Sequence, residues 1–297
     1  MATALLATLL ALLIGHTVPD LARVRDYSWF LHWLGALGER LPGTAFWQSG
    51  AGLLLSLVVP VALIALLQWS LRDVAWGLPS FVLAAIVLFY CWGPRDLDVE
   101  VDAIQSSSDR SQRLEALQRL PDDPPVPPLS MEGGAVVDQV FLAAMSRWFG
   151  VLFWFLMLGA SGALLYRLVC LAAASRAYHE ALPPAQRDMV QRLHQLLNWP
   201  TAQLMTLALA LAADFDAVVT AWRDFHGHRV PGWYSADPGY MTAAARASVD
   251  LDPESDAQAA MDDSAMLAMQ QAMALIWRVL VVWLAALSVM VLAGKIG

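Results

Sequence analysis

Between residues 50 and 92 the chain carries only two charged side chains, Arg72 and Asp73, which are adjacent and lie mid-stretch. As α-helices, the apolar runs 50–71 and 74–92 would be roughly 33 Å and about 28 Å long. The hydrocarbon core of a bilayer is about 30 Å thick, so either run can cross it. Backbone polar groups in hydrocarbon must hydrogen-bond within the chain, which makes such runs helical. The sequence therefore predicts an all-α integral membrane protein with a helical hairpin.

Further apolar runs extend this pattern to five or six membrane helices. The charge of the chain is concentrated between the runs, and eleven of its Arg lie in the polar segments 19–49, 93–147 and 223–271. Excess basic residues mark cytoplasmic segments, so we expect these three on the cytoplasmic side. Segment 201–222 leaves two alternatives, crossing or not, because Asp214 and Asp216 lie in its second half. The predicted spans are 1–18, 50–71, 74–92, 148–171, 201–222 and 273–293.

Composition narrows the class of partner. Charged residues make up 15% of the chain, against about 25% in soluble domains. The net charge of −8 argues against nucleic acid and anionic lipid as main partners. We expect membrane lipid to surround the protein.

The polar segment 93–147 predicts a helix whose Leu97, Val101 and Ile104 share one face, with acidic residues at its positive N-terminal end. In the run 148–171, Gly159 and Ala163 are four residues apart, which favours close helix packing within or between chains. Homo-oligomerisation through this pair stays open.

Two pairs of polar residues at predicted membrane depth or its edge are candidates for function. Tyr166 and Arg167 end an apolar run, where they suit an interfacial anchor and a snorkelling cation. Contact of Arg167 with a headgroup or substrate is the alternative. Asp214 and Asp216 would differ by about 200° around a helix and cannot share one ligand. They indicate either a functional or paired charge in the membrane or a helix end already in water.

No catalytic motif is present. The chain has no phosphate-binding glycine loop, no Gly-x-Ser-x-Gly and no His-Glu-x-x-His. His226 and His228 have no second cluster of matching spacing, which favours an ordinary polar loop. The sequence predicts neither a metal site nor a confident cofactor.

Three stretches in this order resemble the AmpE family: 93–97 (GPRDL), 149–167 (FGVLFW…GALLYR) and 198–204 (NWPTAQL). AmpE proteins are bacterial inner-membrane proteins linked to the regulation of β-lactamase induction and cell-wall recycling. They are in turn similar to the membrane enzyme CobD/CbiB, which joins an aminopropanol unit to cobyric acid in cobalamin synthesis. The resemblance covers nearly the whole chain and implies a multi-pass protein of the inner membrane.

Departures from the enzyme's pattern favour the regulatory family. The resemblance to CobD/CbiB implies a stretch rich in Glu, Asn, Thr and Asp that binds phosphate and metal, but residues 136–147 are largely apolar here. Only Asp138 and Gln139 remain polar in that region, and Gln203 stands where the enzyme has a cation. A phosphoryl or acyl transfer site needs convergent charge. We therefore expect a non-catalytic regulator or sensor that binds a cytoplasmic protein or a cell-wall-derived ligand.

Two alternatives remain. The first is a membrane enzyme of CobD/CbiB type with a reduced, nucleotide- or phosphate-dependent amide-forming site, for which a nucleotide with a divalent metal is the candidate cofactor. Its candidate residues are Arg95, Asp96, Asp138 and Gln139, with Tyr166 and Arg167 at the mouth of the site. The second is a small transporter with Asp214 and Asp216 in a polar path; the absence of a visible inverted repeat argues against it.

Overall fold

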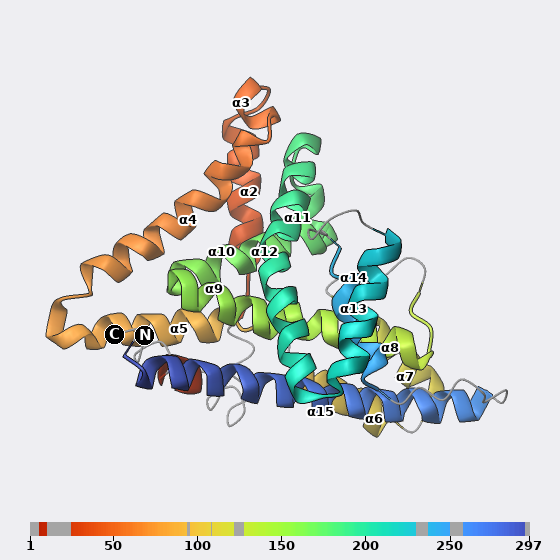
Figure 1. Cartoon of the computed structure of the whole chain (residues 1–297). Coiled ribbons are helices and arrows are strands. Elements are labelled where there is room, and N and C mark those ends of the chain that lie inside the picture. The colour runs from red at the N-terminus through yellow and green to blue at the C-terminus, as the bar shows by residue number, and fades with distance from the viewer. Residues whose placement is uncertain are drawn as a thin grey trace. The chain divides into compact units, whose positions relative to one another are not determined.

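The computed structural model describes residues 6–10, 25–93, 96–107, 109–121, 128–229, 237–249 and 258–294. Within these ranges every regular element is a helix (Figure 1), which confirms the all-α fold class. Most of the predicted span 1–18 lies outside the described residues. Within this span the structure describes residues 6–10, which are helical. The chain forms two compact units. The first comprises Met1–Pro94, Gly150–Leu197 and Ser288–Gly297, and the second Arg95–Phe149 and Asn198–Leu287.

The first unit is built around α10 (Ala160–Ala174), whose side chains are mostly buried. This helix packs against α4, α5, α9 and α11. The other helices of the unit are α2 (Ser28–Arg40), α3 (Ala45–Gln48), α4 (Ala51–Ser70), η2 (Val74–Gly77), α5 (Leu78–Cys91), α9 (Gly150–Leu158), α11 (Arg176–Glu180) and the first half of α12 (Pro184–Ala212).

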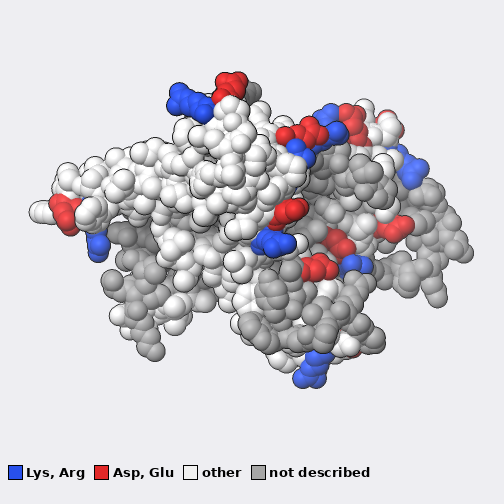
Figure 2. All heavy atoms as spheres, turned by 90° about the horizontal axis from the view of Figure 1, so that it is seen from above, with Lys and Arg blue, Asp and Glu red and all other residues white. Residues whose placement is uncertain are grey.

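Helices α4 and α5 form the predicted hairpin. The chain turns through η2, where Ala75 and Trp76 have positive φ angles of 44° and 59° and Gly77 has 78°. Figure 1 shows α4 and α5 leaving this tip in diverging directions. Only 28% of the apolar window of α4 and 22% of that of Val74–Cys91 is buried within the protein. Figure 2 shows a long uncharged surface over α4. Apolar helix faces left this bare need lipid around them, so the chain is a membrane protein.

The predicted span 148–171 is wrong as a single helix. Gly159 has a φ of 71° and a ψ of −154°, which ends α9 at Leu158. Helix α10 then folds back on α9, so that Tyr166 lies over Gly150. With nine residues, α9 is about 14 Å long. The continuous apolar helix instead runs from Gly133 to Leu158.

The second unit holds the acidic helix α6 (Leu97–Ser106). Its buried residues are Leu97, Val101 and Ile104, which confirms the predicted face. The remaining helices are α7 (Arg110–Gln118), α8 (Gly133–Ala144), the π-helical turn η3 (Met145–Phe149), the second half of α12, α13 (Phe215–Arg229), α14 (Gly239–Ala247) and most of α15 (Gln258–Leu292).

The predicted helix 201–222 is also interrupted. Helix α12 ends at Ala212, and the carboxylate of Asp214 accepts hydrogen bonds from the backbone N–H groups of Asp216 and Ala217 at 2.9 and 3.1 Å. Asp214 thereby starts α13, as an N-cap residue does. By length and composition, four described helices can cross a membrane: Ala51–Ser70, Val74–Cys91, Gly133–Leu158 and Asp263–Leu292. Which of them cross stays a prediction.

Candidate functional site

An ion pair with a buried arginine holds η3 in the second unit. Arg147 is 1% exposed, and its Nη1 lies 2.7 Å from Oε2 of Glu100 on α6. Its Nη2 donates to the carbonyl oxygen of Leu120 at 2.5 Å. A buried guanidinium needs such partners because an uncompensated charge in a protein interior is costly. π-Helical turns recur at functional sites, and here the turn directs a cation into the protein.

A second ion pair lies nearer the surface of the same unit. Oδ1 of Asp138 on α8 is 2.7 Å from Nε of Arg246 on α14, with the two side chains 22% and 48% exposed. The separation is that of an ion pair, without the alignment of a good hydrogen bond. Gln139 is half-buried on the same helix. We call Glu100, Asp138, Gln139, Arg147 and Arg246 the α8 cluster.

Of the two candidate residues in the motif 93–97, the structure describes Asp96, in this unit. Asp96 occupies the N-cap position of α6, but its side chain makes no capping hydrogen bond there. Arg95 lies outside the described residues. The structure thus pairs Asp138 with Arg246 and Glu100 with Arg147, and neither arginine was a candidate from the sequence.

Tyr166 and Arg167 belong to the first unit, and both are fully buried. A Cβ atom on Gly150 would collide with the ring and hydroxyl of Tyr166. Nε of Arg167 donates to the carbonyl oxygen of Cys91 at 2.9 Å. The predicted interfacial anchor, snorkelling cation and mouth of a site are therefore wrong, because neither side chain reaches a surface.

Arg167 is one of three side chains that hold the end of α5. Arg25 donates to the carbonyl oxygen of Gly93 at 3.2 Å, and the hydroxyl of Tyr27 donates to that of Tyr90 at 2.5 Å. The last carbonyl groups of a helix lack partners within it and carry partial negative charge, so cations and hydroxyls stabilise them. Burial raises the pKa of Tyr27 well above its usual range, which keeps this phenol a donor. These residues have a structural role.

Asp214 and Asp216 do not form a polar path. Asp214 caps α13, and both side chains are exposed at the break between α12 and α13. The two aspartates are therefore not successive positions on one membrane helix, and the transporter hypothesis loses the residues on which it rested.

A divalent metal held by the protein alone does not fit the described residues. Among them no three His, Cys, Asp or Glu side chains converge. Asp138, the carboxylate that α8 supplies, is already paired with Arg246. Both cysteines, Cys91 and Cys170, are buried as free thiols, as their apolar surroundings predict.

Comparison with known proteins finds relatives that are named as cobalamin biosynthesis proteins. The chain is 29% identical over 220 residues to the cobalamin biosynthesis protein CobD of Stutzerimonas stutzeri, which covers 72% of this chain and 67% of that protein. The chain is thus similar to a CobD protein over most of its length. A second CobD, from Chromobacterium violaceum, is 32% identical over 110 residues, or 37% of this chain and 34% of that protein. No protein-family model and no solved structure matches the chain.

These relatives confirm the CobD/CbiB resemblance and contradict the interpretation as an AmpE-type regulator of β-lactamase induction. The error has a physical cause. Few polar residues lie within the stretch 136–147 itself, but in the folded chain Glu100 of α6 pairs with Arg147 and Arg246 of α14 pairs with Asp138. Two charged partners of this stretch therefore come from other helices. Arg147 could have been found as the last charge before an apolar run. Arg246 gives no such signal, because it is 108 residues from Asp138.

Proposed function

We propose that this protein is a membrane enzyme of cobalamin biosynthesis that forms an amide bond, the reaction that its CobD/CbiB resemblance implies. The observation that carries the proposal is the similarity to CobD, with 29% identical residues in an alignment that covers 72% of the chain. The four apolar helices agree with a multi-pass protein, which we place in the bacterial inner membrane.

The α8 cluster is the site that we propose for this chemistry. Arg guanidinium groups bind carboxylates and phosphates through paired N–H donors. Arg246 is half-exposed, so a substrate can reach it beside its partner Asp138. We infer that Arg246 holds the anionic group of a substrate and that Asp138 orients Arg246 before the substrate arrives.

The other members of the cluster have supporting roles in this proposal. Arg147 is buried and pairs with the partly exposed Glu100, so this pair fixes η3 against α6. Gln139 offers an amide donor and acceptor beside Asp138. Arg95 and Asp96, which precede α6, remain candidates for binding the same substrate.

An activity assay tests the function. The full chain in lipid nanodiscs would be incubated with cobyric acid, an aminopropanol donor with and without a phosphate group, a nucleotide and Mg²⁺. Mass spectrometry then follows the amide product, and omission of each component in turn defines the requirement. No product with any donor would refute the proposed enzyme.

Variants test the site separately. Asp138→Asn and Arg246→Gln should each lower the rate of amide formation about tenfold or more, because a charge-assisted contact is lost. Asp102→Asn is the matched control, because Asp102 is exposed on α6 of the same unit. Full activity in all three variants would overturn the site while leaving the function intact.

A further inference from the structure

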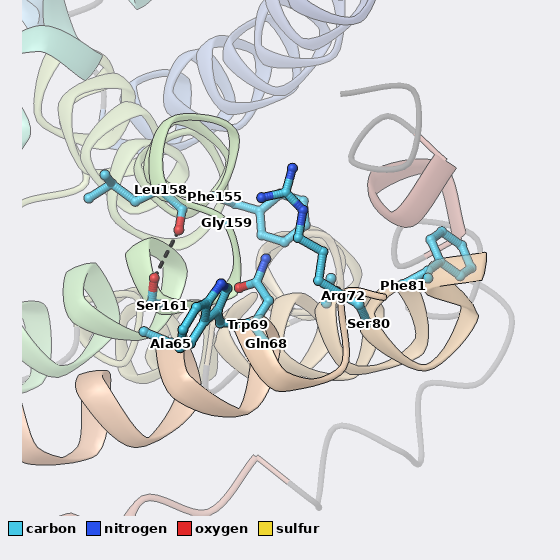
Figure 3. A pocket seen from close by; sticks show the side chains of 12 residues that line it. Ala65, Gln68, Trp69, Arg72, Ser80, Phe81, Phe155, Leu158, Gly159 and Ser161 are labelled. Carbon is cyan, nitrogen blue, oxygen red and sulfur yellow. Dashed lines mark hydrogen bonds between the residues drawn. The ribbon is translucent and has the colours of Figure 1, made fainter. Parts of the chain in front are cut away.

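The first unit contains a cavity that the proposed chemistry does not use. It has a volume of about 500 Å³ and lies by the hairpin tip, between α4, α5 and the corner where α9 meets α10 (Figure 3). The α8 cluster belongs to the other unit. The lining residues are Ala65, Gln68, Trp69, Arg72, Gly77, Ser80, Phe81, Ala84, Phe155, Leu158, Gly159 and Ser161.

The polar part of this cavity suits an anion. Arg72 is the one charged residue among the described lining residues. In Figure 3 its guanidinium extends above Gln68 toward the side of Phe155 and Gly159. Oε1 of Gln68 accepts the N–H of Ala160 at 3.2 Å, which leaves the two donors of its NH₂ group. A positive charge, amide donors and the absence of a lining carboxylate among these residues favour a negatively charged ligand.

The helix ends strengthen that preference. Gly77 and Ser80 belong to the start of α5, and Gly159 and Ser161 to the start of α10. The N-terminal end of a helix carries partial positive charge. Arg72 and residues from the starts of two helices thus line one cavity.

The depth of the cavity points to a ligand from the membrane. The 20 residues of α4 span about 30 Å, so Arg72, two residues beyond its end, would lie at the edge of the bilayer. Trp69 and Trp76 are 71% and 105% exposed at the tip, as expected for aromatic side chains at headgroup level. The remainder of the lining is apolar and continues onto the bare faces of α4 and α5.

We propose that this cavity binds the phosphate headgroup of an anionic phospholipid, whose acyl chains lie along α4 and α5. The net charge of −8 gives no general attraction to such lipids, so the local site has to supply the recognition. The proposal is independent of the enzymatic function. The cavity adjoins the first turn of α5. The motif 93–97, which holds candidate residues of the proposed enzyme, follows the last turn of that helix.

Native mass spectrometry of the full chain tests the proposal. The protein would be released from nanodiscs of phosphatidylcholine with a minor fraction of phosphatidylglycerol. The wild type should retain one phosphatidylglycerol, and Arg72→Gln should weaken that retention about tenfold or more, because a charged hydrogen bond is lost. Ala84→Leu, which fills the cavity without changing charge, should also reduce retention.

Arg40→Gln is the matched control, because Arg40 is exposed at the end of α2, outside the cavity lining. It should retain the lipid as the wild type does. Excess inorganic phosphate separates a lipid headgroup from free phosphate as the ligand. Displacement of the lipid by inorganic phosphate, equal retention by Arg72→Gln and the wild type, or equal loss in Arg40→Gln would each overturn the proposal. Unchanged thermal unfolding of Arg72→Gln shows that the variant is folded.

Discussion

Gly150 provides a test of the packing in the first unit. A Cβ atom there would fall well under 3.0 Å from Cζ and the hydroxyl oxygen of Tyr166, a separation that Cβ atoms essentially never show. The ring would have to retreat to the ordinary contact distance of 3.4–4 Å. Tyr166 is fully buried on the central helix, so it has little space to move.

Two effects oppose each other in Gly150→Ala. Overpacking a core costs about 1–3 kcal/mol, and replacing a helical glycine by alanine returns up to about 1 kcal/mol. Because a rigid aromatic ring is the obstacle, we take the upper end of the cost, which leaves a net loss of about 2 kcal/mol. For a chain of this size that corresponds to a Tm about 4–8 °C lower.

The assay is thermal unfolding in detergent, followed by tryptophan fluorescence. Gly35→Ala is the control, because nothing lies within 4 Å of a Cβ on this glycine of α2. It should raise the Tm by about 2–4 °C. In a Tyr166→Leu background, Gly150→Ala should no longer lower the Tm, since the ring is gone. An unchanged Tm in Gly150→Ala, or the same drop in both backgrounds, would refute the reasoning.

Three further predictions use the same measurement. Glu100→Gln should cost about 3 kcal/mol, because it leaves Arg147 buried without its carboxylate; a loss under about 1 kcal/mol would show that other contacts hold the guanidinium. Asp214→Ala should cost about 1 kcal/mol through loss of the α13 cap, and it should leave amide formation unchanged. Hydrogen bonds from Ser28 hold the pKa of Asp26 below its usual 3.8, so this carboxylate stabilises the fold above about pH 4. That contribution is lost as pH falls through the lower, folded-state pKa. The Tm of Asp26→Asn should therefore depend less on pH over this acidic range than the Tm of the wild type.

Local patterns in the sequence were sufficient for several features. The apolar runs predict helices because hydrocarbon leaves the backbone no other partners, and the spacing of Leu97, Val101 and Ile104 predicts which face α6 buries. These predictions need only the neighbouring residues and the solvent. The fold class and the buried face of α6 are confirmed for the same reason.

The candidate site could not be predicted in the same way. Asp138 was found because it stands out in an apolar stretch, but its partner Arg246 comes from another helix. The choice between a regulator and a CobD-type protein depended on which charged side chains meet α8 and η3, a property that sequence order does not contain.

The sequence by itself determined an all-helical membrane protein with a hairpin interrupted near Arg72 and Asp73, because hydrophobic length and backbone hydrogen bonding are local requirements. The turn itself lies just beyond them, in η2. Only the tertiary structure decided that the apolar stretch 148–171 reverses at Gly159 and that Arg167 is buried against the end of α5. A run of apolar residues is compatible with one long helix or two short ones. The balance is set by what each side chain meets across the fold, as Tyr166 meets Gly150.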